Sequence, residues 1–168
     1  MNIVKADLND LDSLMRLYQA AMNHLIHNGI DQWDEEYPDR ETLREDLEAG
    51  CLFGIVGGDS RYIGAIVMNE EEDTDYSAIP WEDARGKVLY LHRLVVHPDR
   101  QGQGIGRTLL QFAEATAANN GYSSIRLDAY SANPIALNLY ERYGYSRRGD
   151  VFFPKRERPF NCYEKLLK

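Results

Sequence analysis

The sequence is poor in cysteine, with Cys51 and Cys162 as its two examples in 168 residues. Two cysteines provide neither the disulfide framework of a small secreted domain nor a cysteine-rich metal cluster. We therefore expect two reduced, mostly buried thiols and no metal cofactor. The chain also has no apolar run of about eighteen residues, and its first residues lack the apolar core of a signal peptide. A cytoplasmic protein with no membrane partner is the expectation.

An excess of positive charge is absent as well. There are 27 acidic and 19 basic residues, so the formal net charge is -8. This balance argues against a general nucleic-acid binder and favours, weakly, cationic substrates. The length suits one domain over residues 1–168, with no linker, repeat or low-complexity segment to divide it.

The periodicity of apolar residues predicts strands that first form a hairpin and then alternate with helices. Strands are expected at residues 2–5, 51–56, 62–68, 88–96, 124–129, 145–153 and 160–166. Helices are expected from a cap at Asn9 and Asp10 to about Gly29, from about Asp39 to Gly50, from about Ile105 to Asn119, and after Asn133. Residues 69–86 show no clean periodicity and are read as a long loop. This order predicts an α/β (α+β) fold, a mixed sheet flanked by helices.

The stretch Leu91–Gly106 predicts an anion-binding turn, because an apolar strand passes through spaced glycines into a helix. The first turn of a helix has unpaired N–H groups and partial positive charge, and glycines let a phosphate approach them. The spacing G-x-G-x-G differs from the dinucleotide fingerprint, which needs glycine at position 107. A P-loop is excluded because Arg107 stands in place of its lysine and Gln101 in place of its first glycine.

Two motifs stand out, QGQGIG at residues 101–106 and NPIALNLYERYGY at residues 133–145. Together they resemble the motifs of the GNAT superfamily of acyl-CoA N-acyltransferases. The first is Q/R-x-x-G-x-G/A, present as residues 101–106. The second is N-x-x-A-x-x-L-Y-E-x-x-G-F, present as residues 133–145 with Tyr145 in place of the usual phenylalanine. The resemblance covers nearly the full length. It implies a mixed, mostly antiparallel central sheet of about seven strands with about four helices, and acetyl-CoA as co-substrate.

The resemblance also implies which residues bind acetyl-CoA. The glycine turn would hold the pyrophosphate, the end of the preceding strand would hydrogen-bond the pantetheine arm, and the second motif would contact the CoA arm. The residues that match these roles are Leu94, Val95, Val96, Gln101, Gly102, Gln103, Gly104, Ile105, Gly106, Arg107, Thr108, Asn133, Ala136 and Tyr140. Arg107 and Arg100 flank the glycines and reach either phosphate or solvent.

Acetyl transfer to an amine needs a neutral nucleophile, an oxyanion site and a proton for the leaving thiolate. In the family, the tyrosine of the second motif protonates the CoA sulfur, and Tyr140 holds that position. A tyrosine packed on the sheet with its hydroxyl bonded elsewhere is the alternative. His92 is the candidate base, since histidine titrates near neutrality. A structural histidine is an equally open interpretation, and an amine that arrives neutral needs no strong base.

Aromatic residues suggest an acceptor site. Trp33 and Tyr37 lie in the connection 29–38, and Trp81 lies in the loop 69–86. With the nearby carboxylates they would attract a cationic amine, although loop packing explains the tryptophans as well.

The leading hypothesis is an N-acetyltransferase acting by direct transfer on a primary amine of a small molecule. Alternatives are a peptide N-terminal or lysine acetyltransferase, and a catalytically silent CoA-binding regulatory module. The exposed edge of a C-terminal strand leaves monomer and homodimer open.

Overall fold

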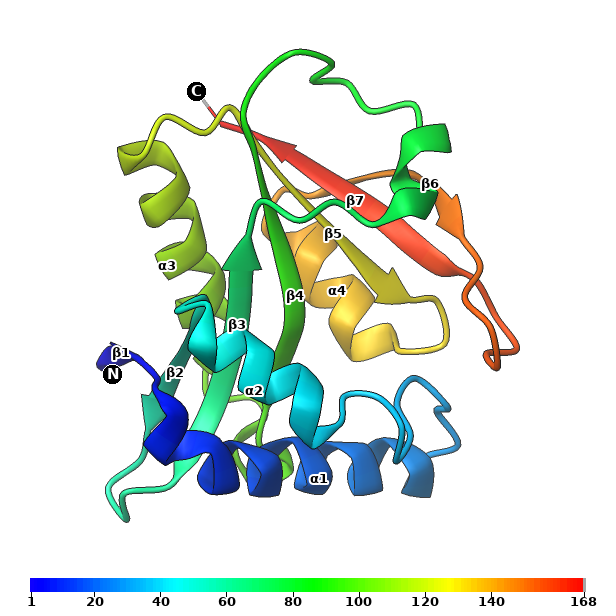
Figure 1. Cartoon of the computed structure of the whole chain (residues 1–168). Coiled ribbons are helices and arrows are strands. Elements are labelled where there is room, and N and C mark those ends of the chain that lie inside the picture. The colour runs from blue at the N-terminus through cyan, green and yellow to red at the C-terminus, as the bar shows by residue number, and fades with distance from the viewer. Residues whose placement is uncertain (168) are drawn as a thin grey trace. The chain divides into compact units, whose positions relative to one another are not determined.

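The computed structural model describes residues 1–167, which form both helices and strands (Figure 1). The strands are β1 (Ile3–Lys5), β2 (Leu52–Val56), β3 (Tyr62–Asn69), β4 (Val88–Val96), β5 (Ser124–Tyr130), β6 (Ser146–Val151) and β7 (Phe160–Leu166). The helices are α1 (Leu11–His27), α2 (Arg40–Glu48), α3 (Ile105–Asn119) and α4 (Pro134–Arg142). Short 3-10 turns occur at η1 (Leu8–Asp10), η2 (Thr74–Ala78) and η3 (Pro98–Arg100).

The strands form one sheet in the order β1-β2-β3-β4-β5-β7-β6. β2 pairs antiparallel with β1 and β3, β7 pairs antiparallel with β5 and β6, and β4 pairs parallel with β5. The predicted mixed, mostly antiparallel sheet with four helices is thus confirmed over residues 1–167. The hairpin expected at the glycine-rich turn 57–60 is the β2–β3 connection.

The chain separates into two units, each with its own internal contacts. Unit 1 contains residues 1–68 and 93–112, and unit 2 contains residues 69–92 and 113 onward. Strand β4 passes from unit 2 into unit 1 between His92 and Arg93, and α3 passes back between Phe112 and Ala113. The single domain expected for residues 1–168 stays a prediction.

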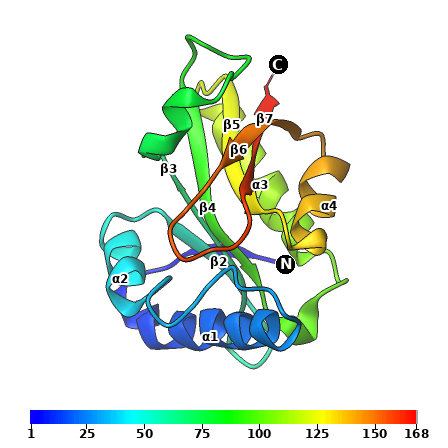
Figure 2. The ribbon, with the colours of Figure 1, turned by 90° about the vertical axis from the view of Figure 1, so that its right-hand side faces the viewer.

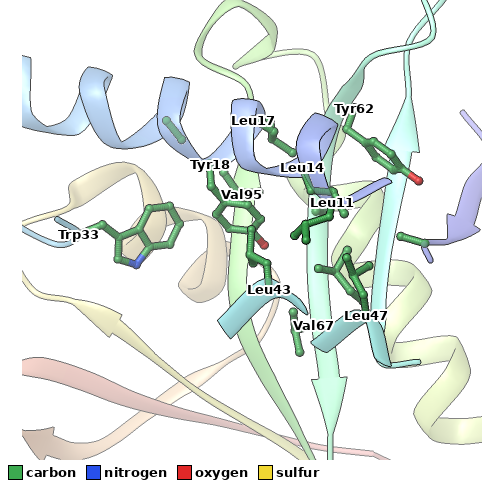
Figure 3. Close-up of a cluster of buried hydrophobic side chains, with 14 residues drawn as sticks. Leu11, Leu14, Leu17, Tyr18, Trp33, Leu43, Leu47, Tyr62, Val67 and Val95 are labelled. Atoms are coloured by element: carbon green, nitrogen blue, oxygen red, sulfur yellow. The ribbon is translucent and has the colours of Figure 1, made fainter. Parts of the chain in front are cut away.

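In unit 1, α1 and α2 pack their apolar stripes against β2 and β3 (Figure 3). Leu14 and Leu43 come from the two helices, and Ala65 and Val67 come from one face of β3. The alternate face of β3 meets the first turns of α3, where Gly64 lies under Ile105 and Leu109. Strand β3 is buried on both faces, which explains why it reads as an almost continuous apolar run.

The helix ends in unit 1 follow the predicted signals, with one difference. Asp10 is the N-cap residue of α1 as expected, but its carboxylate accepts the Asp7 amide in a capping box around η1 and caps no amide of α1. Asp39 caps α2 by accepting from the Thr42 amide at 2.9 Å. Left-handed glycines follow both helices, at Gly29 and Gly50.

In unit 2, two segments cover opposite faces of the strands. Figure 2 shows α4 on one side of β5 and β7, and the green turn η2 on the other. The hydrogen bonds agree, since Tyr163 of β7 donates to Glu141 of α4 and Tyr76 of η2 donates to Asp128 of β5. The segment 69–86, read from sequence as a plain loop, therefore contains an ordered turn, which Asp73 caps.

Both cysteines lie within residues 1–167, the part of the chain that the structure describes. Both cysteines are free thiols, Cys162 buried and Cys51 half-buried. Burial and the negative charge of Asp128 raise the pKa of the Cys162 thiol to about 12, which keeps it protonated. No helix in this part of the chain combines the length and apolar character needed to span a bilayer. Within the same residues, no group of three or more histidine, cysteine or acidic side chains is placed to hold a metal ion.

The close approach of β3 and α3 can be tested at Gly64. A Cβ there would lie 2.6 Å from Ile105 Cγ2 and 3.3 Å from the Val95 carbonyl oxygen. Overpacking of this kind costs about 1–3 kcal/mol. We expect Gly64→Ala to lower the free energy of unfolding by that amount in denaturant titration. Gly58→Ala is the matched control, because a Cβ at Gly58 meets nothing within 4 Å. Equal stability of the two variants would contradict the packing.

Candidate active site

The glycine turn of unit 1 has the backbone that the sequence predicts. Gly102 and Gly104 have φ angles of 80° and 81°, in the left-handed region that glycine adopts without strain. A Cβ at either glycine would meet nothing within 4 Å, so the space beside the turn is open. The first helical bond of α3 runs from the Thr108 amide to the Gly104 carbonyl at 3.0 Å. The amides of residues 105–107 therefore precede the helical ladder, as an anion site requires.

Thr108 also binds the turn through its side chain. Its hydroxyl donates to the Gly104 carbonyl at 2.9 Å, which ties the end of the turn to the first turn of α3. On the other side, η3 begins at Pro98, and His97 accepts from the Asp99 amide at 3.1 Å. The predicted turn is thus fixed by local hydrogen bonds at both ends.

Arg93 has an unusual backbone conformation within β4, just before the predicted pantetheine segment, Leu94, Val95 and Val96. Its φ angle is 50°, a conformation that costs an L-residue about 1–2 kcal/mol. Its guanidinium donates to both Asp46 oxygens, at 2.9 and 2.6 Å, and to the Tyr37 hydroxyl at 2.8 Å. The Tyr18 hydroxyl donates to the Arg93 carbonyl at 2.6 Å. Side-chain bonds from α1, α2 and the connection 29–38 therefore hold the strained residue.

This network also places two of the predicted acceptor residues of unit 1. Tyr37 is 41% exposed and uses its hydroxyl to accept from Arg93. Trp33 is buried and packs against Tyr18 at 5.6 Å between ring centroids. Their contact with substrate stays a prediction. Sequence reasoning missed Arg93 and Asp46, although Asp46 lies between Leu43 and Leu47 on the buried face of α2, which was a readable signal.

Tyr140 lies in unit 2 on α4, which begins at Pro134. Asn133 caps this helix through its side-chain oxygen, which accepts from the Ala136 amide at 3.2 Å. The Tyr140 ring is 7% exposed and packs between Tyr145 and Tyr163, each at 5.9 Å. Within residues 1–167, no group hydrogen-bonds its hydroxyl. Burial, followed by the Asp128 and Tyr163 charges, raises the pKa of Tyr140 well above its usual value, so the phenol is protonated at neutral pH.

His92, the predicted base, lies in unit 2 near the end of that unit's part of β4. Its Nε2 lies 2.8 Å from the Asn69 side-chain oxygen. An amide oxygen can only accept, so this contact assigns the proton of a neutral imidazole to Nε2 and the lone pair to Nδ1. The tautomer is thus fixed by a residue at the end of β3, as a directed base requires.

Trp81 anchors the segment 69–86 to the sheet of unit 2. Its indole N–H donates to the Tyr76 carbonyl at 3.0 Å, and the Arg126 guanidinium lies 4.4 Å from its ring centroid. Arg126 in turn pairs with buried Glu164, which also accepts the Glu82 amide at 2.8 Å. One face of Trp81 is therefore occupied by a cation of the protein itself. Its predicted contact with substrate stays a prediction.

The candidate residues fall into both units. Unit 1 contains the glycine turn, Leu94, Val95, Val96, Trp33 and Tyr37, whereas unit 2 contains His92, Trp81, Asn133, Ala136 and Tyr140.

Within unit 2, sequence reasoning missed the contact of Tyr76 with Asp128, whose 2.5 Å bond joins η2 to β5. A charged residue in an otherwise buried strand was the available signal for Asp128.

A sequence model of the Acetyltransferase (GNAT) family matches residues 11–145. The match spans most of the chain, which therefore belongs to the GNAT acetyltransferase family and is an acyl-CoA acetyltransferase enzyme. The resemblance inferred from the two motifs is thereby confirmed.

Individual relatives agree with the family. The uncharacterized N-acetyltransferase YesJ of Bacillus subtilis is 28% identical over 143 residues, which are 83% of this chain and 78% of YesJ. A streptothricin acetyltransferase of Escherichia coli is 25% identical over 114 residues, 68% of this chain and 57% of that protein. A GNAT-family acetyltransferase structure from Streptococcus agalactiae superposes with a TM-score of 0.85 at 22% identity, covering 99% of this chain and 95% of the other. The structural likeness establishes the fold.

The buried tyrosines predict how stability depends on pH. Burial is the largest cause that raises the pKa of Tyr18, Tyr62, Tyr76, Tyr140, Tyr145 and Tyr163, the last to about 12. Because the folded state favours the neutral phenol, this stabilisation is complete below the unfolded pKa of about 10 and is lost as pH rises through the folded values. We expect the free energy of unfolding to fall from about pH 10 upward. Denaturant titrations at several pH values, with phenolate absorbance, measure this, and a constant stability to about pH 12 would contradict it.

Proposed function

We propose that the enzyme transfers the acetyl group of acetyl-CoA to a primary amine of a small molecule, by direct attack of the amine on the thioester. The observation that carries this proposal is the state of the Tyr140 phenol. It is buried, protonated at neutral pH and without a hydrogen-bond partner in residues 1–167. A satisfied structural tyrosine would have its hydroxyl bonded, so the uncommitted proton supports a general acid.

Acetyl-CoA supplies an activated acetyl group and an anionic pyrophosphate. The open space beside Gly102 and Gly104 and the amides of residues 105–107 fit the pyrophosphate, with Arg107 beside them. The left-handed Arg93 directly precedes Leu94, and Leu94 and Val96 are partly accessible. Backbone groups there are suited to the pantetheine amides and to the oxyanion.

The proposed transfer balances as follows. The ammonium of the acceptor gives one proton to His92, and the neutral nitrogen forms a C–N bond with the acetyl carbon. The C–S bond then breaks, and the CoA sulfur takes the Tyr140 proton. The new amide nitrogen loses its second proton, which restores Tyr140, and His92 releases its proton to solvent. One ammonium and one thioester thus give one amide, one thiol and one proton.

Two observations support a small acceptor. The segment 69–86, held to β5 and β7 through Tyr76, Trp81 and Glu82, occupies one face of unit 2 with ordered structure. The streptothricin acetyltransferase among the relatives is named for a small molecule. The chain spans 57% of that protein, so the acceptor of this enzyme is part of the proposal.

Replacement of the phenol hydroxyl tests the proposed acid. We expect Tyr140→Phe to lower kcat by about 10²–10⁴-fold, the usual contribution of a positioned acid, while acetyl-CoA binding is unchanged. Thiol release from acetyl-CoA against a panel of amines, polyamines and peptides measures the rate, and calorimetry measures CoA affinity. Tyr122→Phe is the matched control, since the Tyr122 hydroxyl donates to the exposed Glu70 carboxylate at 2.9 Å. Full activity of Tyr140→Phe at all pH values would refute the acid role.

The pH profile tests the proposed base. In the wild type, kcat/KM is expected to fall on acidification with one histidine-like inflection, because protonated imidazole cannot accept a proton. We expect the profile of His92→Gln to lack this inflection. We also expect its kcat/KM to be lower than that of the wild type by about 10²-fold. His97→Gln serves as control, because His97 lies in the η3 turn and accepts from a backbone amide. An unchanged profile in His92→Gln would show that water or another group takes the proton.

A further inference from the structure

The bond between Tyr76 and Asp128 lies on the side of the unit 2 strands opposite α4. We propose that the Asp128 carboxylate, oriented by Tyr76, is the subsite that binds the ammonium group of the acceptor. The acceptor would then belong to the class of primary alkylammonium ions. This inference rests on the proposed amine acetylation and adds to it a binding residue that neither motif contains.

The strand register brings Asp128 to the same face as His92. β4 and β5 are paired in parallel over Val88–Tyr90, and the last pair is Tyr90 with Arg126. Side chains alternate along both strands, so the next residues on that face are His92 and Asp128. The pairing of β5 with β7 continues to Tyr130, so β5 itself stays regular here.

Asp128 and His92 are both partly accessible, and each directly follows buried residues of its strand. Asp128 is the one residue of β5 that is not fully buried. In the unit 2 part of β4, residues 89–91 are buried and His92 is partly accessible. A carboxylate and an imidazole on one face, both within reach of solvent in otherwise buried strands, form a polar site that a ligand can enter.

The surroundings of Asp128 favour a charged ligand over water. Tyr76 is 2% exposed, and its ring packs on Trp81 at 5.3 Å and on Tyr90 at 6.0 Å. The Tyr76 hydroxyl donates to one carboxylate oxygen at 2.5 Å, which fixes the orientation of the group. An ion pair beside buried aromatic rings is less screened than one in water, so a bound ammonium is held more strongly there.

Tyr140 approaches β5 from the opposite face. Its ring packs on Tyr163, which is paired in register with Leu127, whereas Asp128 is paired with Cys162 on the other face. Burial, followed by the Asp128 charge, raises the pKa of Tyr140.

The test compares binding of n-butylammonium chloride with that of its neutral analogue n-butanol, by calorimetry in the presence of CoA. We expect Asp128→Asn to weaken n-butylammonium binding by about 10- to 100-fold, the usual contribution of a hydrogen bond to a charged group. The asparagine side chain has an oxygen that can accept from the Tyr76 hydroxyl, so the bond that joins η2 to β5 is preserved. Butanol binding is expected to be equal in both proteins.

Glu141→Gln is the matched control, because Glu141 accepts from the Tyr163 hydroxyl at 2.6 Å on the α4 face. It should leave n-butylammonium binding unchanged. A second measurement uses the wild type and so does not depend on the folding of Asp128→Asn. The carboxyl carbon resonance of Asp128 in ¹³C-labelled protein should shift when n-butylammonium is added and should not shift with butanol.

Three results would overturn the inference: no n-butylammonium binding by the wild type, equal binding by Asp128→Asn, or an unmoved Asp128 resonance. Failure of the proposed function gives a different result, namely no thiol release from acetyl-CoA with any amine of the panel. The two failures are therefore distinguishable.

Discussion

The Arg93 guanidinium, bound through two nitrogens to the Asp46 carboxylate, is the interaction on which the candidate site depends. Arg93 has a left-handed backbone inside β4, where a regular strand would continue. A buried ion pair adds little net stability, since desolvation offsets its attraction, but leaving either charge unpaired would be costly. The pair therefore acts by fixing conformation. Tyr18, which bonds the Arg93 carbonyl, fixes the backbone itself.

The fixed backbone of Arg93 constrains the residues that precede and follow it in the chain. The preceding residue, His92, ends the unit 2 part of β4, and the following residues lead through Leu94–Val96 to the glycine turn and α3. A regular β4 would commit its backbone groups to neighbouring strands, which leaves none for a ligand. The left-handed conformation of Arg93 costs about 1–2 kcal/mol, and the network around Asp46 holds that strain just before the segment that we propose for the pantetheine arm.

The parts of the site that sequence predicted are those encoded locally. The glycine turn depends on left-handed positions at Gly102 and Gly104, and the cap of α4 depends on Asn133 followed by proline, so neighbouring residues specify both. Period-two and helical patterns likewise located the seven strands and four helices. The Arg93–Asp46 and Tyr76–Asp128 contacts join residues 47 and 52 positions apart, respectively, and no local pattern encodes such a pairing. They depend on strand order, which one sequence does not specify.

The two faces of β5 provide two different environments within unit 2, one for the protonated Tyr140 phenol and one for the Asp128 carboxylate. Tyr140, the proposed general acid, keeps its proton because it is buried among aromatic rings on the α4 face. Asp128, the proposed ammonium subsite, is partly accessible on the η2 face, where Tyr76 donates to its carboxylate. The strand separates these environments, yet the Asp128 charge still raises the pKa of Tyr140 and discourages its ionisation.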